Sequence, residues 1–153
     1  MTEPRDTVPL PITRREGTRD LPLPRYMSDL ASGLDVAAAL DAPVVLEPGD
    51  VRAIPTGISL AVPPGYEIQV RARSGLALKH GITLVNGVGS IDADYRGEIA
   101  VILGNIGRKP FTIERGMRVA QLVLARVARA EILVVEALET TARGAGGFGH
   151  TGA

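Results

Sequence analysis

Hydrophobic and polar residues alternate along much of this chain, in short segments that end at glycine or proline. The clearest is YEIQVRAR, residues 66–73, in which Ile68, Val70 and Ala72 alternate with charged or amide side chains. A period of two places one face of a strand in the core and the other in solvent. Similar segments are PVVLEPG, VRAIPTGISLAVPPG, GITLVNGVG, GEIAVILGN, FTIERG, MRVAQLVLARV and AEILVVEAL. Their lengths and turn-bounded spacing predict an all-β sandwich or barrel.

Two segments favour a helix instead. In SGLALKHG, residues 74–81, Ser74 suits an N-cap, helix formers follow, and Gly81 suits the position after the last turn. This pattern predicts one short helix at about residues 75–80. The segment GLDVAAALDA also has helical propensity, but Gly33 and the flanking turn residues leave it ambiguous.

The two ends of the chain differ from its middle. We expect a single domain over residues 1–142, in which 1–24 form a loosely attached arm with one strand. The glycine-rich residues 143–153 are expected to form a flexible tail. Residues 119–138 are nearly continuously apolar, which suits strands covered on both faces. A neighbouring subunit is one source of that cover, and a well-buried sandwich strand is the other.

Composition restricts the function classes. The 153 residues are 45% hydrophobic but only 3% aromatic, so the core must be aliphatic. Lysine plus arginine and aspartate plus glutamate each number 17, so no net charge attracts nucleic acid or an anionic membrane. The absence of cysteine excludes disulfides and zinc–thiolate sites. The charged, proline-rich start lacks the apolar core of a signal peptide, and no run could span a membrane, so we expect a soluble, cytoplasmic protein.

The segment NGVGSIDADYRGE, residues 86–98, concentrates polar side chains that can do chemistry. In an extended segment Asp92 and Asp94 point the same way and Tyr95 the other. A carboxylate held in a loop can activate a water molecule. The Asn86 amide offers a donor and an acceptor, which suits the edge of a pyrimidine. On these residues alone, a solvated turn with incidental acids is the stronger interpretation.

Other segments could bind phosphate. Arg73 and Ser74 lie where a strand meets the start of the predicted helix, whose free N–H groups attract anions. ERGMRVAQL places Arg115, Arg118 and Gln121 around a tight turn at Gly116. The tail combines Arg143 with glycines that expose backbone N–H groups and with Phe148, which could stack on a base. A capped helix and a hairpin with surface arginines are the simpler alternatives.

The order of these segments distinguishes them from chance. SGLDVAA, RSGLALKHG, NGVGSIDADYRGEI, RGMRVAQLV and RGAGGFGHTG resemble, in sequence order, the five motifs of the trimeric dUTPase family, over residues 32–152. The resemblance implies a jelly-roll-like fold, with a strand rather than a helix in GLDVAAAL. It also implies a homotrimer with active sites shared between subunits, Mg²⁺, and hydrolysis of dUTP to dUMP and pyrophosphate. Such an enzyme limits uracil incorporation into DNA and supplies dUMP for thymidylate synthesis.

The resemblance also implies roles for individual residues. Asp92 is expected to orient and deprotonate the attacking water, and Tyr95 to pack under the deoxyribose. Asn86 and the backbone of its hairpin, Gly89 included, are expected to read the uracil edge. Asp35 is expected to contact Mg²⁺ through water. The residues expected to bind the phosphates or cover the base are Arg73, Ser74, Gly75, Gln121, Arg143, Gly147, Phe148 and Thr151.

Two residues depart from the family pattern. Met117 stands where aspartate is common, which predicts the loss of a polar contact at a turn or between subunits. His150 stands where serine is common, which puts one phosphate contact in question. A dCTP deaminase-type enzyme on the same fold is the nearest alternative, although it lacks the RGxGGFGxTG tail. A non-catalytic nucleotide-binding module is a third, against which the retention of Asp92, Tyr95 and Arg143 argues.

Overall fold

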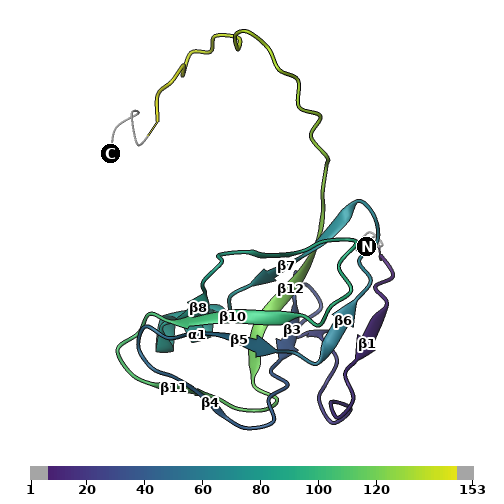
Figure 1. Ribbon diagram of the computed structural model, residues 1–153, viewed down its shortest axis with the longest axis vertical. Coiled ribbons are helices and arrows are strands. Elements are labelled where there is room, and N and C mark those ends of the chain that lie inside the picture. The colour runs from purple at the N-terminus through teal and green to yellow at the C-terminus, as the bar shows by residue number, and fades with distance from the viewer. Residues whose placement is uncertain (1–6, 148–153) are drawn as a thin grey trace.

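The computed structural model describes residues 7–147, and this part of the chain consists of short strands and one short helix (Figure 1). The elements are β1 (Ile12–Arg14), β2 (Arg25–Tyr26), β3 (Leu34–Ala37), β4 (Val44–Leu46), β5 (Val51–Pro55), β6 (Ile58–Leu60), β7 (Tyr66–Arg71), α1 (Ser74–His80), β8 (Ile82–Leu84), β9 (Gly89–Ile91), β10 (Ala100–Asn105), β11 (Phe111–Ile113) and β12 (Arg118–Arg126).

Antiparallel pairing joins these strands into sheets. The largest has five strands in the order β2-β3-β12-β7-β9. A three-stranded sheet has the order β5-β10-β8, and two further pairs are β1-β6 and β11-β4. Because β12 lies between β3 and β7, the five-stranded sheet brings the first, second and fourth motifs side by side.

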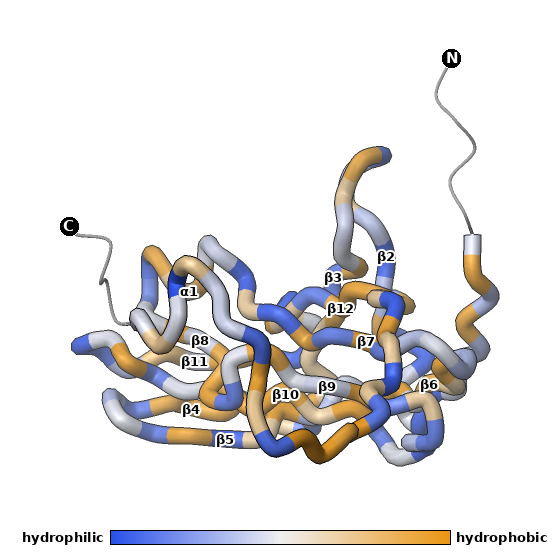
Figure 2. Tube along the Cα trace, turned by 90° about the horizontal axis from the view of Figure 1, so that it is seen from above, coloured by the Kyte–Doolittle hydropathy of each residue, from blue (hydrophilic) through white to orange (hydrophobic). Residues whose placement is uncertain are grey.

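The core between these sheets is aliphatic, as the composition predicts. Figure 2 shows hydrophobic and hydrophilic residues following one another closely along the strands. In β7, Ile68 and Val70 are buried and Arg71 is exposed, so the alternation expected of YEIQVR is confirmed. The largest fully buried side chains are Leu46, Ile54, Ile68, Ile82, Ile99, Leu103, Ile113, Leu122, Val36, Val62, Val101 and Val119.

The helix α1 forms where the sequence predicts it, but its cap differs. Arg73 is the N-cap residue, and its carbonyl accepts the first helical hydrogen bond, from the N–H of Ala77 at 3.1 Å. The prediction of Ser74 as N-cap is therefore wrong: Ser74 is already helical, and no side chain caps this end. At the other end Gly81 has φ of 70°, a left-handed conformation that glycine adopts without strain.

The segment after β12 contradicts one expectation. AEILVVEAL was predicted as a strand, but residues 127–147 form none, and Figure 1 shows them running away from the sheets. Ile132 is 82% exposed and Val134 96% exposed. A strand needs a neighbour for its backbone hydrogen bonds, and among residues 7–147 the segment pairs with none. The apolar segment is thus left uncovered by its own chain.

The first described residues contact the sheets. β1 pairs with β6 along its whole length, and Arg15 donates to the Ala39 carbonyl at 2.8 Å. Thr18 and Leu21 are buried. Within the described part of the arm, residues 7–24, β1 is thus the one strand, and it is hydrogen-bonded to β6. Among the described residues no helix is long enough to cross a bilayer.

Candidate active site

Asp35 joins residues from three of the motifs. It lies on β3, and its side chain is only 4% exposed. Its Oδ1 accepts a hydrogen bond from Gln121 Nε2 at 2.8 Å, and its Oδ2 accepts one from Arg118 Nη1 at 3.0 Å. Arg73 Nε lies 3.5 Å from the same Oδ2. A buried carboxylate needs such partners, because burial without them is costly.

A β-bulge in β12 makes this arrangement possible. Arg118 pairs with Ala37 and Ala120 with Val36, so the register shifts between the two. In a regular strand, residues three positions apart face opposite sides of the sheet. The extra residue re-aims the strand, so that Arg118 and Gln121 both reach Asp35.

Arg73 is held at the start of α1 by two contacts. Besides its ion pair with Asp35, its Nη1 donates to the backbone carbonyl of Arg118 at 2.9 Å. Ser74 and Gly75 lie exposed in the first turn that follows. Two guanidinium groups thus share one carboxylate, which leaves a net positive charge beside a helix start. This charge suits an anionic phosphate chain.

Asp92 and Tyr95 line a second feature, a cavity of about 270 Å³. They follow β9, and Ala53 and Ile102, which pair across β5 and β10, contribute apolar lining. Asp92 is exposed, so its carboxylate can reach solvent. The Tyr95 hydroxyl donates to the Glu98 carbonyl at 3.0 Å, which fixes the ring against the loop.

Asn86 and Gly89 lie close together at the opposite end of β9. Asn86 is exposed in the turn, whereas Gly89 is buried and pairs with Val70. A Cβ added to Gly89 would lie 3.1 Å from Asn86 Nδ2 and 3.2 Å from Val70 Cβ. Both distances are shorter than ordinary contacts, so a side chain at this position would require the amide of Asn86 or Val70 to shift by a few tenths of an ångström.

Some of the side chains predicted for the site lie apart from the others within the described residues. Arg143 is exposed, and its Nε donates to the Gly146 carbonyl at 2.9 Å. No hydrogen bond or ion pair within residues 7–147 joins it to Asp92 or to the cluster around Asp35. Gly147 is half-buried. The predictions for Phe148, His150 and Thr151 lie outside the described residues.

Sequence reasoning did not find the partnership of Arg118 with Asp35. The sequence placed Arg118 only near a turn, together with Arg115 and Gln121. The signal was the run RVAQL, in which the consecutive residues Val119 and Ala120 are both buried. Two adjacent core residues interrupt the period of two, which is typical of a bulge.

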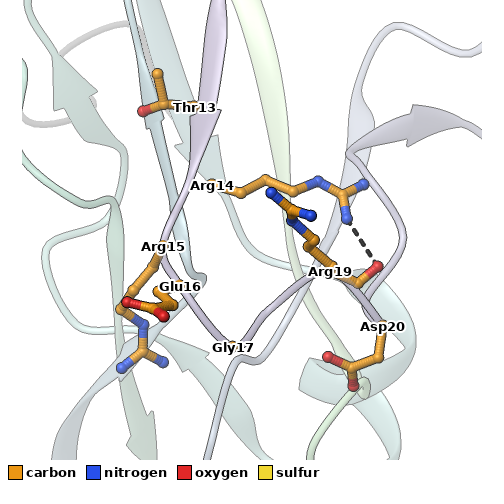
Figure 3. Close-up of a pocket in the computed structure, with 7 residues that line it drawn as sticks. All are labelled: Thr13, Arg14, Arg15, Glu16, Gly17, Arg19 and Asp20. Atoms are coloured by element: carbon orange, nitrogen blue, oxygen red, sulfur yellow. Dashed lines mark hydrogen bonds between the residues drawn. The ribbon is translucent and has the colours of Figure 1, made fainter.

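A further cavity, of about 950 Å³, lies along the loop after β1 (Figure 3). Two of its charged side chains have structural partners: Arg14 Nη1 donates to the carbonyl of Arg19 at 3.0 Å, and Asp20 accepts from Arg115 at both oxygens. The Arg115 hydrogen bonds lower the pKa of Asp20 below its usual range. None of the residues predicted for the site lines this cavity, whose lining residues are Thr13, Arg14, Arg15, Glu16, Gly17, Arg19 and Asp20.

Comparison with known proteins places this geometry in a family. The dUTPase family model matches residues 19–152, which include all five motifs. This chain belongs to the dUTPase family. The resemblance on which the sequence interpretation rests is thereby confirmed.

Relatives of this dUTPase-family chain agree. Deoxyuridine 5'-triphosphate nucleotidohydrolase of Desulfotalea psychrophila is 62% identical over 135 residues, 88% of this chain and 90% of that protein. The protein of that name from Caldanaerobacter subterraneus is 52% identical over 146 residues, 95% of this chain and 99% of that protein. The dUTPase of Staphylococcus bacteriophage 80alpha with dUPNHPP has a TM-score of 0.86, 26% identity, and coverage of 96% of this chain and 100% of its own. The expected jelly-roll-like all-β class is consistent with that match.

The family resemblance predicts a water-mediated Mg²⁺ contact at Asp35. Both oxygens of this carboxylate accept hydrogen bonds, and Arg73 and Arg118 place positive charge within 3.5 Å and 3.0 Å of it. A cation beside it would be repelled by both groups. Within residues 7–147 no cluster of three or more His, Cys, Asp or Glu could hold a metal ion. The surroundings of Asp35 therefore do not suit direct coordination of Mg²⁺ by its carboxylate, and the contact through water stays a prediction.

Met117, the departure from the family's common aspartate, has a role in packing. Its side chain is half-buried against the hydrophobic core. Its backbone completes the turn before β12, since its carbonyl accepts from Ala38 N–H at 2.8 Å and its N–H donates to the Glu114 carbonyl at 3.1 Å. Methionine thus preserves the turn by backbone bonds and adds apolar contact.

Proposed function

We propose that this chain hydrolyses dUTP to dUMP and pyrophosphate. The family match over residues 19–152 carries this proposal, because it includes every motif from which the roles below are drawn. The relatives named deoxyuridine 5'-triphosphate nucleotidohydrolase support it at 62% and 52% identity. Neither a deaminase nor a non-catalytic module has an observation in its favour.

The proposed reaction is an in-line attack of water on the α-phosphorus. Asp92 accepts a proton as the new P–O bond forms, and the bond to the bridging oxygen breaks to release pyrophosphate. The exposed position of Asp92 on its cavity supports this role. Arg73, already oriented by Asp35, offsets the negative charge on the phosphate oxygens, and Arg143 does so at the far end of the chain of phosphates.

Specificity for the base and sugar is assigned to the hairpin around β9. The Asn86 amide, kept close to β9 by Gly89, pairs with the uracil edge. A site built to pair with uracil rejects cytosine because its polar groups would be left unpaired. Tyr95, tied to the Glu98 carbonyl, packs under the deoxyribose and leaves no room for a 2′-hydroxyl. Phe148 covers the base, and Thr151 and the backbone of Gly147 donate to the last phosphate.

Mg²⁺ is proposed as an ion that accompanies the triphosphate. Phosphate oxygens and water are the ligands that Mg²⁺ prefers, and proteins usually add few of their own. A mutant dUTPase from phage phi11 of S. aureus, with 22% identity, a TM-score of 0.77 and coverage of 87% of this chain and 100% of its own, coordinates a structural Mg(II) ion. Because Asp35 is occupied by its own partners, the substrate is the better source of direct ligands here.

A homotrimer with shared active sites is the proposed assembly. The exposed segment around Ile132 and Val134 supports it, since an apolar strand-like segment needs cover that its own chain does not give. The distribution of the site supports it too. Within the described residues, Arg143 has no contact with Asp92, so a tail from another subunit is the natural way to complete each site.

The test measures pyrophosphate release from a panel of deoxynucleoside triphosphates by Asp92→Asn and Asp94→Asn variants. Asp94 is a matched control, because it is also an exposed acid of the same loop but has no assigned role. We expect release from dUTP alone, a fall of about 10²- to 10⁴-fold for Asp92→Asn, and little change for Asp94→Asn. Near-normal turnover by Asp92→Asn would remove Asp92 from the mechanism. Ammonia release from dCTP, or tight binding of dUTP without products, would refute the proposed activity itself.

A further inference from the structure

Arg118 touches the phosphate-binding cluster through both its side chain and its backbone. Its Nη1 donates to Asp35 Oδ2 at 3.0 Å, and its carbonyl accepts from Arg73 Nη1 at 2.9 Å. We propose that Arg118 is a positioning residue, which sets the guanidinium of Arg73 for the phosphates without binding them itself. This inference rests on the proposed function, since it assumes that Arg73 binds a triphosphate.

The contacts of Arg73 show what positioning would achieve. Its Nε faces Asp35 at 3.5 Å and its Nη1 is bound to the Arg118 carbonyl. One guanidinium nitrogen is therefore hydrogen-bonded and a second is in an ion pair, and no partner for Nη2 is found among the described residues. A planar guanidinium held at two atoms has its third aimed in one direction. That atom is available for a phosphate oxygen before the substrate arrives.

The side chain of Arg118 contributes by fixing two partners of Arg73 at once. Its bond to Asp35 holds the carboxylate that faces Arg73 Nε. The same bond anchors the bulge that presents the Arg118 carbonyl. Removing only the side chain keeps that carbonyl but frees both it and the carboxylate to move. The expected consequence is a misplaced Arg73 rather than a lost phosphate contact.

The packing of β12 indicates that Arg118 is not needed for the fold, so a positioning role can be tested separately from a structural one. The side chain of Arg118 is 44% exposed, whereas the adjacent Val119 and Ala120 are buried and carry the core contacts of the bulge. Truncating an exposed arginine to methionine keeps most of its apolar stem. The fold should therefore survive an Arg118→Met substitution, and its effect should appear in ligand binding.

The experiment compares two ligands by calorimetry: the non-hydrolysable analogue dUPNHPP and 2′-deoxyuridine, which has no phosphate. Arg118→Met is expected to lower the affinity for the analogue about tenfold, which is the effect of losing one hydrogen bond to a charged group. Deoxyuridine affinity should stay unchanged. Arg118→Lys, which can still donate to Asp35, should recover part of the loss. Arg52→Met is the matched control and should leave both affinities unchanged. Arg52 lies on β5 in the three-stranded sheet, where it forms an ion pair with Asp50.

A double substitution decides between positioning and direct contact. In an Arg73→Ala background, Arg118→Met should lower the affinity for the analogue by less than about twofold, because the Arg73 guanidinium that Arg118 orients is already absent. A full and additive loss would instead make Arg118 a phosphate ligand and overturn the proposal. The proposal would also be overturned if Arg118→Met lowered the affinity for deoxyuridine as much as that for the analogue, or left the affinity for the analogue unchanged. If the wild-type protein released no pyrophosphate from dUTP, the proposed function would fail, while the analogue titrations would still report on Arg118.

Discussion

Replacing Asp35 by asparagine tests the cluster at its centre. The amide keeps the size of the side chain but removes the charge and one acceptor. In the wild-type protein the two oxygens accept from Gln121 and Arg118. An amide has one acceptor oxygen, so one of these donors loses its partner. In addition, Arg73 and Arg118 are left near each other without a shared counter-charge.

The structure limits the size of the effect. Removing one member of a buried ion pair costs about 3–5 kcal/mol. Here the carboxylate is 4% exposed but the side chains of Arg73 and Arg118 are 26% and 44% exposed, so water stabilises part of the unpaired charge. We therefore expect Asp35→Asn to lower the free energy of unfolding by about 2 kcal/mol. For a chain of this length that corresponds to a fall in melting temperature of roughly 4–8 °C.

Scanning calorimetry at one fixed protein concentration measures this change, because assembly makes melting temperatures depend on concentration. Asp20→Asn is the control: it breaks an exposed ion pair with Arg115 and should shift the melting temperature less. Affinity for dUPNHPP should fall with Asp35→Asn, while the Mg²⁺ concentration that gives half-maximal turnover should not change. If Asp35→Asn kept the wild-type melting temperature and full affinity for dUPNHPP, Asp35 would not be the residue that holds the cluster together. A selective rise in the required Mg²⁺ concentration would instead assign Asp35 to the metal.

Two further predictions concern the hairpin and the loop after β1. Gly89→Ala should lower kcat/KM for dUTP about tenfold by displacing Asn86, while affinity for inorganic triphosphate, which has no base for Asn86 to read, should stay unchanged. An equal loss of affinity for triphosphate would contradict this reason. Arg115 lowers the pKa of Asp20 below 3.8, so the pair stabilises the fold above that pH and loses its effect as the pH falls through the lowered value. The difference in melting temperature between wild type and Asp20→Asn should therefore shrink below pH 3.8, and a constant difference down to the lowest pH tested would count against the pair.

Local patterns sufficed wherever a local interaction decides the structure. The helix α1 was predictable because Gly81 ends it, and β7 because its apolar residues alternate. The segment that became β3 was ambiguous by propensity, and pairing with β12 decided it. The strand predicted around Val134 does not form, because a non-local interaction decides its structure. Its pattern is that of a strand, but a strand also requires a partner, which the sequence of one chain cannot specify.

The site divides in the same way. Motif order predicted which residue types are present, among them Asp35, Arg73 and Gln121. It did not predict that Asp35 accepts a hydrogen bond from Gln121 and forms an ion pair with Arg73. That juxtaposition depends on strand order and on the bulge after Arg118, both of which are properties of pairing between distant segments. The only trace in the sequence is the interrupted alternation at Val119.

The charge of the whole chain explains why this cluster matters for binding. Basic and acidic residues balance at 17 each, so the protein has no net field with which to attract a triphosphate from a distance. Affinity must then come from groups that act at contact range. Arg73, held by the Asp35 carboxylate and the Arg118 carbonyl, supplies a positive charge whose geometry is set before binding. Because little has to be ordered when the substrate arrives, a few well-placed donors can do what net charge does in more basic proteins.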